Sequence, residues 1–461
     1  MSYTLLTTVK ISALAFTFFC AASFADQDHE HRRESLRALD ASIQQLGMDV
    51  SSAERDAIAS AMLAGLDVSR AAQQQNSPRY GDRFRRDAHA KATGCLRAEF
   101  EVNGDIPNQF RHSVFANPGR RYQAWIRFSN GDMLVQTDGE KDARGMAIKL
   151  MGVNGTPLAP ELGAGGTQDF LMANNQAFFN RNIHDYAENM QHLARLDRSG
   201  WFFSLWPPRL HLKQLVRAAQ TVSSTIDTPL QERYFSILPY RLGETEIKFA
   251  SRPCAGADYP ITVDQSDENF LTAQLADNLQ SASACFDFVV QPRNTDANTP
   301  LDDATVIWEE KDSPFIPIAR IHIPPQTFTS EAQWEFCENL SMNPWRGVGE
   351  WEPLGSLNRA RRLVYHAVSE FRHTSNNAPQ QEPEGWCLPG EVCTPQQGLN
   401  IVKPTWPLPR CFDALARSVD GQVLDSQCAD DSYAIDFSAQ KVEAGAAPGS
   451  SAATKSIQSH Y

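Results

Sequence analysis

Residues 96–102 read Leu-Arg-Ala-Glu-Phe-Glu-Val, with apolar and polar side chains in alternation. Successive side chains of a β-strand point to opposite faces, so this pattern predicts a strand with one buried face. Turn residues separate it from similar runs at 122–128, 146–151, 247–252, 286–290 and 318–323. No regular alternation of strands with helices is present, which disfavours a parallel sheet. We therefore expect an α+β fold, an antiparallel β-barrel with additional helices.

Apolar residues at helical spacing flank and interrupt the strands. They predict helices near residues 183–195, 208–222 and 356–373. Before the strands, a first helix is expected around Leu36, Leu39, Ile43 and Leu46. Residues 51–54, Ser-Ser-Ala-Glu, resemble a capping box, so a second helix should begin there and run to about Leu66. The result is a helical N-terminal arm over residues 26–80 and a core over residues 81–375.

The two ends of the chain differ from this core. Lys10 precedes the apolar run 11–20, and the small residues of 21–25 follow it. This order is typical of a secretory signal peptide cleaved after Ala25, with an uncleaved anchor as the alternative. We expect a periplasmic or secreted protein with no stable membrane insertion after cleavage. Residues 376–461 form an extension rich in Pro, Gly, Gln and Ser, and its last part, 443–461, predicts disorder.

The cysteines fit an exported protein. Nine are present, and eight remain once Cys20 leaves with the signal peptide. An even number in an oxidising compartment predicts disulfides. Two pairings are plausible from local spacing, Cys387 with Cys393 and Cys411 with Cys428. The spacing leaves the pairing open for the other four, which are Cys95, Cys254, Cys285 and Cys337.

Charge and composition exclude one class of partner. The chain has 42 basic and 55 acidic residues, a formal net charge of −13, which argues against an electrostatic nucleic-acid binder. Apolar residues make up 42% of the sequence, as in a globular protein with a substantial core.

One helical segment carries an unusual grouping of side chains. Residues 361–373 read Arg-Arg-Leu-Val-Tyr-His-Ala-Val-Ser-Glu-Phe-Arg-His. On a helix, Arg361 and Arg372 lie on the same broad face as Tyr365, four residues before it and seven after it. Two guanidinium groups beside a phenol favour its anionic form. The segment is therefore a candidate for a tyrosine held as phenolate.

Six segments, in order along the chain, resemble the haem catalase family. They are "RDAHAKATGCLRAEFEV" (86–102), "RFSNGD" (127–132), "DARGMAIKL" (142–150), "DFLMANNQAFF" (169–179), "FIPIARIHI" (315–323) and "RRLVYHAVSEFRH" (361–373). The likeness covers roughly residues 80–375. It implies a catalase-like barrel that binds haem b and its iron and breaks down hydrogen peroxide to water and oxygen. Such proteins usually assemble as homo-oligomers.

The resemblance assigns roles on the proximal side of the haem. Tyr365 would be the iron ligand, bound as phenolate, and Arg361 would stabilise its negative charge. A free phenol has a pKa of about 10, so the metal and a nearby cation are both needed to ionise it at neutral pH. The haem propionates would be neutralised by Arg86, Arg127 and Arg372.

On the distal side, His89 would take a proton from bound peroxide and return it to the leaving oxygen. Asn174 would hold the peroxide by a hydrogen bond, and Ser129 would fix the histidine ring through its other nitrogen. Phe178 would form part of the wall of the pocket.

The sequence also departs from the family pattern. His366-Ala367-Val368 replaces the usual Pro-Asp-Thr after the tyrosine, and Ala90-Lys91-Ala92 replaces Ala-Lys-Gly. Two alternatives therefore stand beside catalase. One is a haem peroxidase or a fatty-acid hydroperoxide-converting enzyme similar to allene oxide synthases, and the other is a non-enzymatic haem-binding protein. Ala88 favours catalase over an enzyme similar to allene oxide synthases. In those enzymes a threonine beside the distal histidine restrains the histidine.

Overall fold

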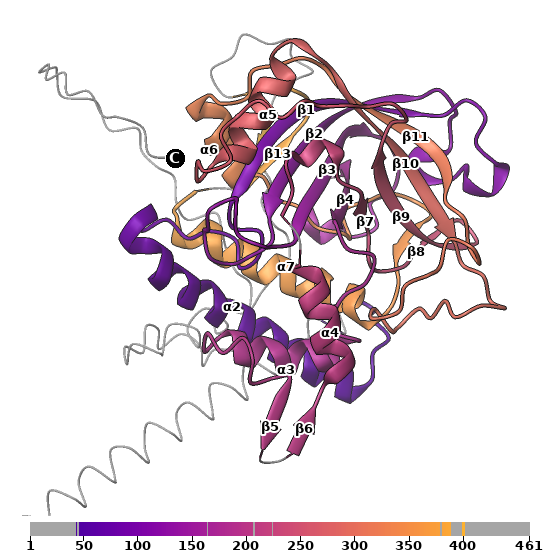
Figure 1. The fold of residues 1–461 in the computed structure, drawn as a ribbon. Coiled ribbons are helices and arrows are strands. Elements are labelled where there is room, and N and C mark those ends of the chain that lie inside the picture. Colours follow the sequence, from indigo (N-terminus) through magenta and orange to yellow (C-terminus); the bar gives the residue numbers. More distant parts are fainter. Residues whose placement is uncertain are drawn as a thin grey trace, which may run out of the picture.

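In the residues that the computed structural model describes, eight antiparallel strands close into a barrel (Figure 1). The described residues are 43, 46–163, 165–205, 208–223, 225–378, 380–388 and 399–401. In order around the barrel the strands are β1 (Ala92–Val102), β2 (Arg121–Asn130), β3 (Arg144–Val153), β4 (Gly166–Ala173), β7 (Tyr234–Phe235), β9 (Thr245–Pro253), β10 (Ala284–Pro292) and β11 (Ile316–Ile323). The ring closes because β11 pairs with both β10 and β1.

This architecture confirms the predicted antiparallel barrel. Six of its strands lie where alternation placed them, each with ends extended by a few residues. Two strands, β4 and β7, were not predicted. In β4 the residues are buried along most of its length, so the alternation is lost, and β7 has two residues, too few to show a period.

Aromatic side chains fill the barrel interior. The ring of Phe288 lies 4.9–5.8 Å, centroid to centroid, from four others, those of Phe100, Phe115, Phe170 and Phe249. Small barrels are commonly packed with side chains in this way. A ligand site therefore has to lie outside the barrel wall, on the outward-facing side chains of its strands.

Three helices form a layer beside the barrel: α2 (Ser52–Tyr80), α3 (Ile183–Leu193) and α7 (Ser356–Ser375) (Figure 1). Helix α2 begins as predicted, with the Ser51 hydroxyl accepting from the Glu54 amide at 3.2 Å. Its predicted end near Leu66 is wrong, since the helix continues to Tyr80. Further along, Val68 and Ala72 are buried against the loop after β2 and against α3, so this packing extends the helix.

The remaining elements lie around the barrel. Helix α4 (Leu212–Thr221) starts later than expected, because Pro208–Leu210 forms strand β6 with β5 (Phe203–Leu205). Two helices that the sequence did not predict, α5 (Phe270–Ser281) and α6 (Glu331–Asn339), pack beside β1. The other short strands are β8 (Tyr240–Leu242), β12 (Trp351–Pro353), β13 (Gln381–Pro383) and β14 (Leu399–Ile401). Among the described helices, none has both the length and the apolar character to cross a bilayer.

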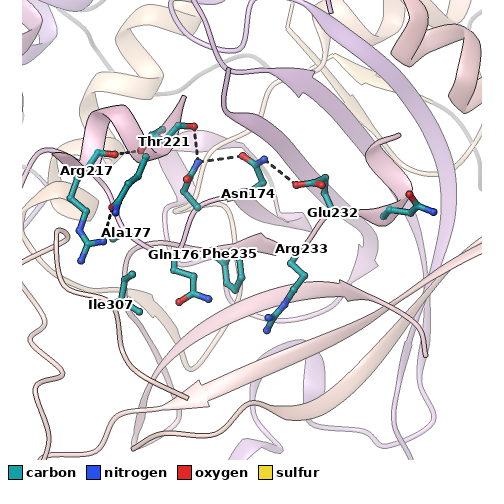
Figure 2. Close-up of a pocket in the computed structure, with 12 residues that line it drawn as sticks. Asn174, Gln176, Ala177, Arg217, Thr221, Glu232, Arg233, Phe235 and Ile307 are labelled. Atoms are coloured by element: carbon teal, nitrogen blue, oxygen red, sulfur yellow. Dashed lines mark hydrogen bonds between the residues drawn. The ribbon is translucent and has the colours of Figure 1, made fainter. Parts of the chain in front are cut away.

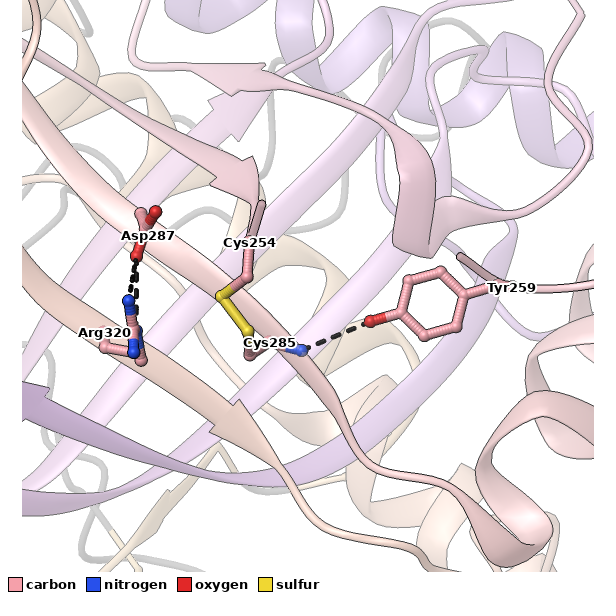
Figure 3. The surroundings of a disulfide bond; sticks show 5 residues. All are labelled: Cys254, Tyr259, Cys285, Asp287 and Arg320. Carbon is pink, nitrogen blue, oxygen red and sulfur yellow. Dashed lines mark hydrogen bonds and ion pairs between the residues drawn. A yellow bond between two sulfur atoms is a disulfide. The ribbon is translucent and has the colours of Figure 1, made fainter. Parts of the chain in front are cut away.

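One disulfide, Cys254–Cys285, joins the end of β9 to the start of β10 across a Cα–Cα distance of 5.6 Å (Figure 3). The amide of Cys285 also donates to the Tyr259 hydroxyl at 3.3 Å. Cys387 belongs to a disulfide as well, while Cys95 and Cys337 are free and buried. The predicted signal peptide, the first predicted helix apart from Ile43 and Leu46, and the predicted disulfide partners Cys393, Cys411 and Cys428 lie outside the described residues.

Four buried charges join the start of the C-terminal extension to the barrel. Lys149 Nζ lies 2.7 Å from Asp169 Oδ1, and Arg346 Nη1 lies 2.9 Å from Asp169 Oδ2. Glu382 completes the group by pairing with both cations. Two positive and two negative charges therefore balance in a dry environment, where an unpaired charge would be costly.

Candidate active site

His89 lies where the chain enters β1 and has a strained backbone. Its φ of 57° falls in the left-handed region, which is unfavourable for residues with a side chain. Two bonds hold it there: its amide donates to the Gly131 carbonyl at 3.0 Å, and Arg127 Nη2 donates to the His89 carbonyl at 2.8 Å. Strain maintained in this way is common at functional residues.

The His89 ring is held from its Nδ1 side. This nitrogen lies 3.1 Å from the Ser129 hydroxyl, so the structure brings together two predicted site residues. Ser129 and Arg127 are two apart on β2 and point away from the barrel interior, which Phe128 between them helps to fill. The bond leaves Nε2 as the ring nitrogen available for a ligand.

Burial and nearby cations keep this imidazole neutral. Burial lowers the pKa of His89 to about 4, and the positive charges of Arg127, Arg86 and Arg361 act in the same direction. The side chain nevertheless keeps part of its surface accessible. A neutral, partly accessible imidazole is suited to accept a proton at physiological pH.

Gly145 is a site residue that the sequence analysis missed. In the register of β2 and β3 it pairs with Ser129, and a Cβ built on it would lie 2.6 Å from His89 Nδ1 and 2.8 Å from Ser129 Oγ. Only glycine leaves room for the ring at this position. The signal was a glycine inside a strand pattern, which often marks a close approach of another group.

Gly145→Ala is expected to displace the His89 ring from the Ser129 hydroxyl, because the added Cβ cannot share this space with the ring. The distance from His89 Nδ1 to Ser129 Oγ in a crystal structure of the variant measures the displacement. Gly104→Ala is a matched control, because a Cβ there meets nothing within 4 Å. The same ring position in both variants would show that Gly145 has no role in placing the ring.

Helix α7 carries the second half of the site. Arg361 Nη2 donates to the Tyr365 hydroxyl at 3.1 Å, and its Nη1 donates to Asn358 Oδ1 at 3.0 Å. Arg361 and Tyr365 both keep part of their surface accessible. The guanidinium therefore contacts the phenol oxygen directly. The residue after the tyrosine, His366, is buried, and burial lowers its pKa to about 4.

Three arginines gather around Glu338 at the end of α6. Its carboxylate lies 3.6 Å from Arg86 Nη1 and 4.0 Å from Arg127 Nη2, and its carbonyl accepts from Arg372. Burial alone would raise the pKa of Glu338, but the charges of these arginines hold it below its ordinary value. Burial lowers the pKa of Arg86 to about 10 and of Arg372 to about 9.

This cluster carries an excess of positive charge. Its three guanidinium groups face two carboxylates, those of Glu338 and Asp87. Burial raises the pKa of Asp87 to about 6. Two buried nitrogens, Arg86 Nη1 and Arg127 Nε, make no hydrogen bond. Buried cations without full compensation favour an anionic ligand. The cluster thus suits an anionic ligand, and the binding of haem propionates by Arg86, Arg127 and Arg372 stays a prediction.

Phe178 lies beside the α7 half of the site. Its ring is 4.6 Å from that of Phe179 and 6.3 Å from that of Tyr186 on α3. Burial raises the pKa of the Tyr186 phenol, and the nearby Asp87 and Tyr365 act in the same direction. Tyr186 therefore lies within electrostatic range of Asp87 and Tyr365. Like Gly145 and Glu338, it is a residue that the sequence analysis did not identify.

Asn174 is directed differently from the other predicted residues. Its Oδ1 accepts from the Arg144 amide at 2.8 Å and its Nδ2 donates to Glu232 Oε2 at 3.1 Å. It lines a cavity of about 540 Å³ together with Gln176, Arg217, Glu232, Arg233 and others (Figure 2). Asn174 thus comes directly after β4, which pairs with the strand that carries Gly145. The hydrogen bonds of its side chain nevertheless go to Arg144, Glu232 and Asn175, not to His89.

Comparisons with known proteins give a distant match to the fold. No protein-family profile matches the chain, and no curated protein matches it. Among solved structures it is similar to a fungal catalase (16% identity, TM-score 0.48), to catalase A from Saccharomyces cerevisiae (18%, 0.49) and to a bacterial catalase (17%, 0.47). These matches cover 62%, 63% and 63% of this chain and 59%, 63% and 57% of those chains.

Proposed function

We propose that this protein is a haem-dependent oxidoreductase that breaks down hydrogen peroxide to water and oxygen. The observation that carries the proposal is the combination of a neutral, strained His89 held by Ser129 with a Tyr365 hydroxyl bonded to Arg361. A base and an ionisable phenol, with an excess of buried positive charge beside them, suit an anionic cofactor whose iron takes a phenolate ligand.

Different residues would hold the iron and the propionates of the cofactor. Tyr365 would ligate the iron, and Arg361 would stabilise the phenolate through the bond already present at 3.1 Å. Arg86, Arg127 and Arg372 would bind the propionates, for which Arg127 Nε, buried without a hydrogen bond, has a free donor. The haem supplies, when bound, a ferric ion that exchanges electrons with peroxide.

His89 would perform the proton transfer. Its Nε2 accepts a proton from one oxygen of hydrogen peroxide and returns it to the other as the O–O bond breaks, so that water can leave. Ser129 keeps the ring in place during both steps through Nδ1. Asn174 would bind the peroxide only after its amide rotates away from Glu232.

The low pKa of His89 makes a prediction about pH. The base must be neutral to accept a proton, and its pKa of about 4 keeps it neutral well below the range of an ordinary histidine. Oxygen release should therefore stay near its maximum down to about pH 5 and fall only as the pH approaches 4. Absorption spectra at each pH control for loss of haem. An acid limb with its midpoint near 6.5 would contradict a His89 whose pKa is lowered.

The proposal is tested by purifying the full chain with haem supplied. A high-spin ferric spectrum typical of tyrosinate ligation, followed by oxygen release from hydrogen peroxide, is the expected result. A haem spectrum with conversion of organic hydroperoxides but no oxygen release would instead identify the alternative peroxidase or hydroperoxide-converting enzyme. A folded protein without a haem band would refute haem binding altogether.

A further inference from the structure

Two free cysteines, which the proposed haem chemistry does not use, lie against each other behind the arginine cluster. Cys95 belongs to β1 and Cys337 to the last turn of α6, and both are buried, with 1% and 0% of their surface accessible. Each thiol lies close enough to the other to shift its pKa. Both belong to one apolar cluster, whose other buried members are Trp125, Met151, Phe336, Leu340 and Leu388.

A second contact fixes the helix at this point. Gln333 Nε2 donates to the Cys95 carbonyl at 2.6 Å, and Gln333 lies one helical turn before Cys337. Residues four apart share a face of a helix, so the face of α6 that meets β1 presents Gln333 to the Cys95 backbone and Cys337 to its side chain. The approach of the two sulfur atoms is thus set by the packing of the whole helix.

The two thiols differ in acidity. Burial raises the pKa of Cys95, and the neighbouring Cys337 thiol adds to the rise. Burial and the charge of Glu338 oppose ionisation of Cys337 too, but the neighbouring Cys95 and the positive charges of Arg127 and Arg86 lower its pKa below the ordinary value. Cys337 is therefore the thiol suited to attack, and Cys95 the one suited to resolve.

We propose that Cys95 and Cys337 form a peroxide-oxidisable dithiol that closes to a disulfide between β1 and α6. The Cys337 thiolate attacks one oxygen of hydrogen peroxide, the O–O bond breaks, and a sulfenic acid and hydroxide form. The Cys95 sulfur then displaces water from the sulfenic acid, giving the disulfide. In total, two thiols and one hydrogen peroxide give one disulfide and two waters. Two cysteine thiols are oxidised and the peroxide is reduced.

The bond would fix the part of α6 that holds the arginines. The carbonyls of Cys337 and Leu340 accept from Arg86, at 3.1 and 2.7 Å, and the carbonyl of Glu338 accepts from Arg372. A covalent link at Cys337 therefore restrains the residues that surround the excess positive charge. Formation of the bond does not depend on haem, so it can be measured whether or not haem is bound.

The test uses the full chain, reduced under mild conditions that leave Cys254–Cys285 intact and then exposed to one equivalent of hydrogen peroxide. After alkylation and digestion without reductant, mass spectrometry should detect a cross-linked peptide pair containing Cys95 and Cys337. The same pair found in the reduced protein before peroxide is added would overturn the proposal, because the bond would then be a structural disulfide that peroxide does not form. The Cys254–Cys285 peptide pair serves as an internal control for the fold.

Two single variants separate the roles of the thiols. In Cys95→Ser, the sulfenic acid on Cys337 has no partner and should be trapped by dimedone. In Cys337→Ser, Cys95 should stay a thiol. The proposal is overturned if peroxide leaves both cysteines alkylatable in the intact protein, or if Cys95→Ser gives no adduct at Cys337 while Cys254–Cys285 is intact.

Discussion

Tyr365→Phe is expected to yield a folded protein that no longer retains haem, or that binds it with a strongly shifted absorption spectrum. The change removes only the hydroxyl that accepts from Arg361, and the ring keeps its place on α7. Without the oxygen there is no anionic ligand for the iron, and Arg361 adds one more uncompensated positive charge. Haem content per chain and the position of the Soret band measure the result.

A matched control lies on the other side of the same arginine. Arg361 Nη1 also lies 3.5 Å from the Tyr240 hydroxyl, and Tyr240 is buried. Tyr240→Phe removes a phenol oxygen from the same guanidinium without touching the proposed ligand, so its haem content should match that of the unchanged protein. Full haem content with an unchanged spectrum in Tyr365→Phe would remove Tyr365 as the ligand.

His89→Ala is expected to keep haem and lose peroxide cleavage by about 10²–10⁴-fold, the range that general acid–base catalysis contributes. The carbonyl of residue 89 still accepts from Arg127 in the variant, so the arginine cluster is preserved. The steady-state rate of oxygen release, divided by haem content, isolates the proton-transfer role.

The control for this variant is His184→Gln, because His184 is an exposed histidine on α3, where it has no role in the proposed site. It should leave the rate unchanged. Peroxide cleavage at full rate in His89→Ala would show that the proton is handled by another group, and the assignment of the distal side would fail.

The parts of the structure that the sequence predicted are those set by local pattern. Alternation located six barrel strands, because apolar and polar side chains alternate along the sequence of these segments. Spacing on a helix likewise predicted the pairing of Arg361 with Tyr365, since residues four apart meet on one face.

The parts that escaped prediction depend on distant segments. Glu338 has no local signal, and its role arises because α6 packs beside β1 and brings its carboxylate to Arg86 and Arg127. Gly145 on β3 acts through the ring of His89, which lies just before β1 and is distant in the sequence. The direction of the Asn174 side chain is set by Glu232, which lies outside the segment that suggested its role.

The four buried charges that join the C-terminal extension to the barrel affect when the chain can fold during its synthesis. Lys149, Asp169 and Arg346 are all synthesised before Glu382, which supplies the second negative charge. While the chain is still being translated, the barrel can close around two cations and a single carboxylate, an arrangement that disfavours burial. Completion of the fold should therefore wait until the segment around residue 382 leaves the ribosome, and protease resistance of stalled nascent chains would reveal that delay.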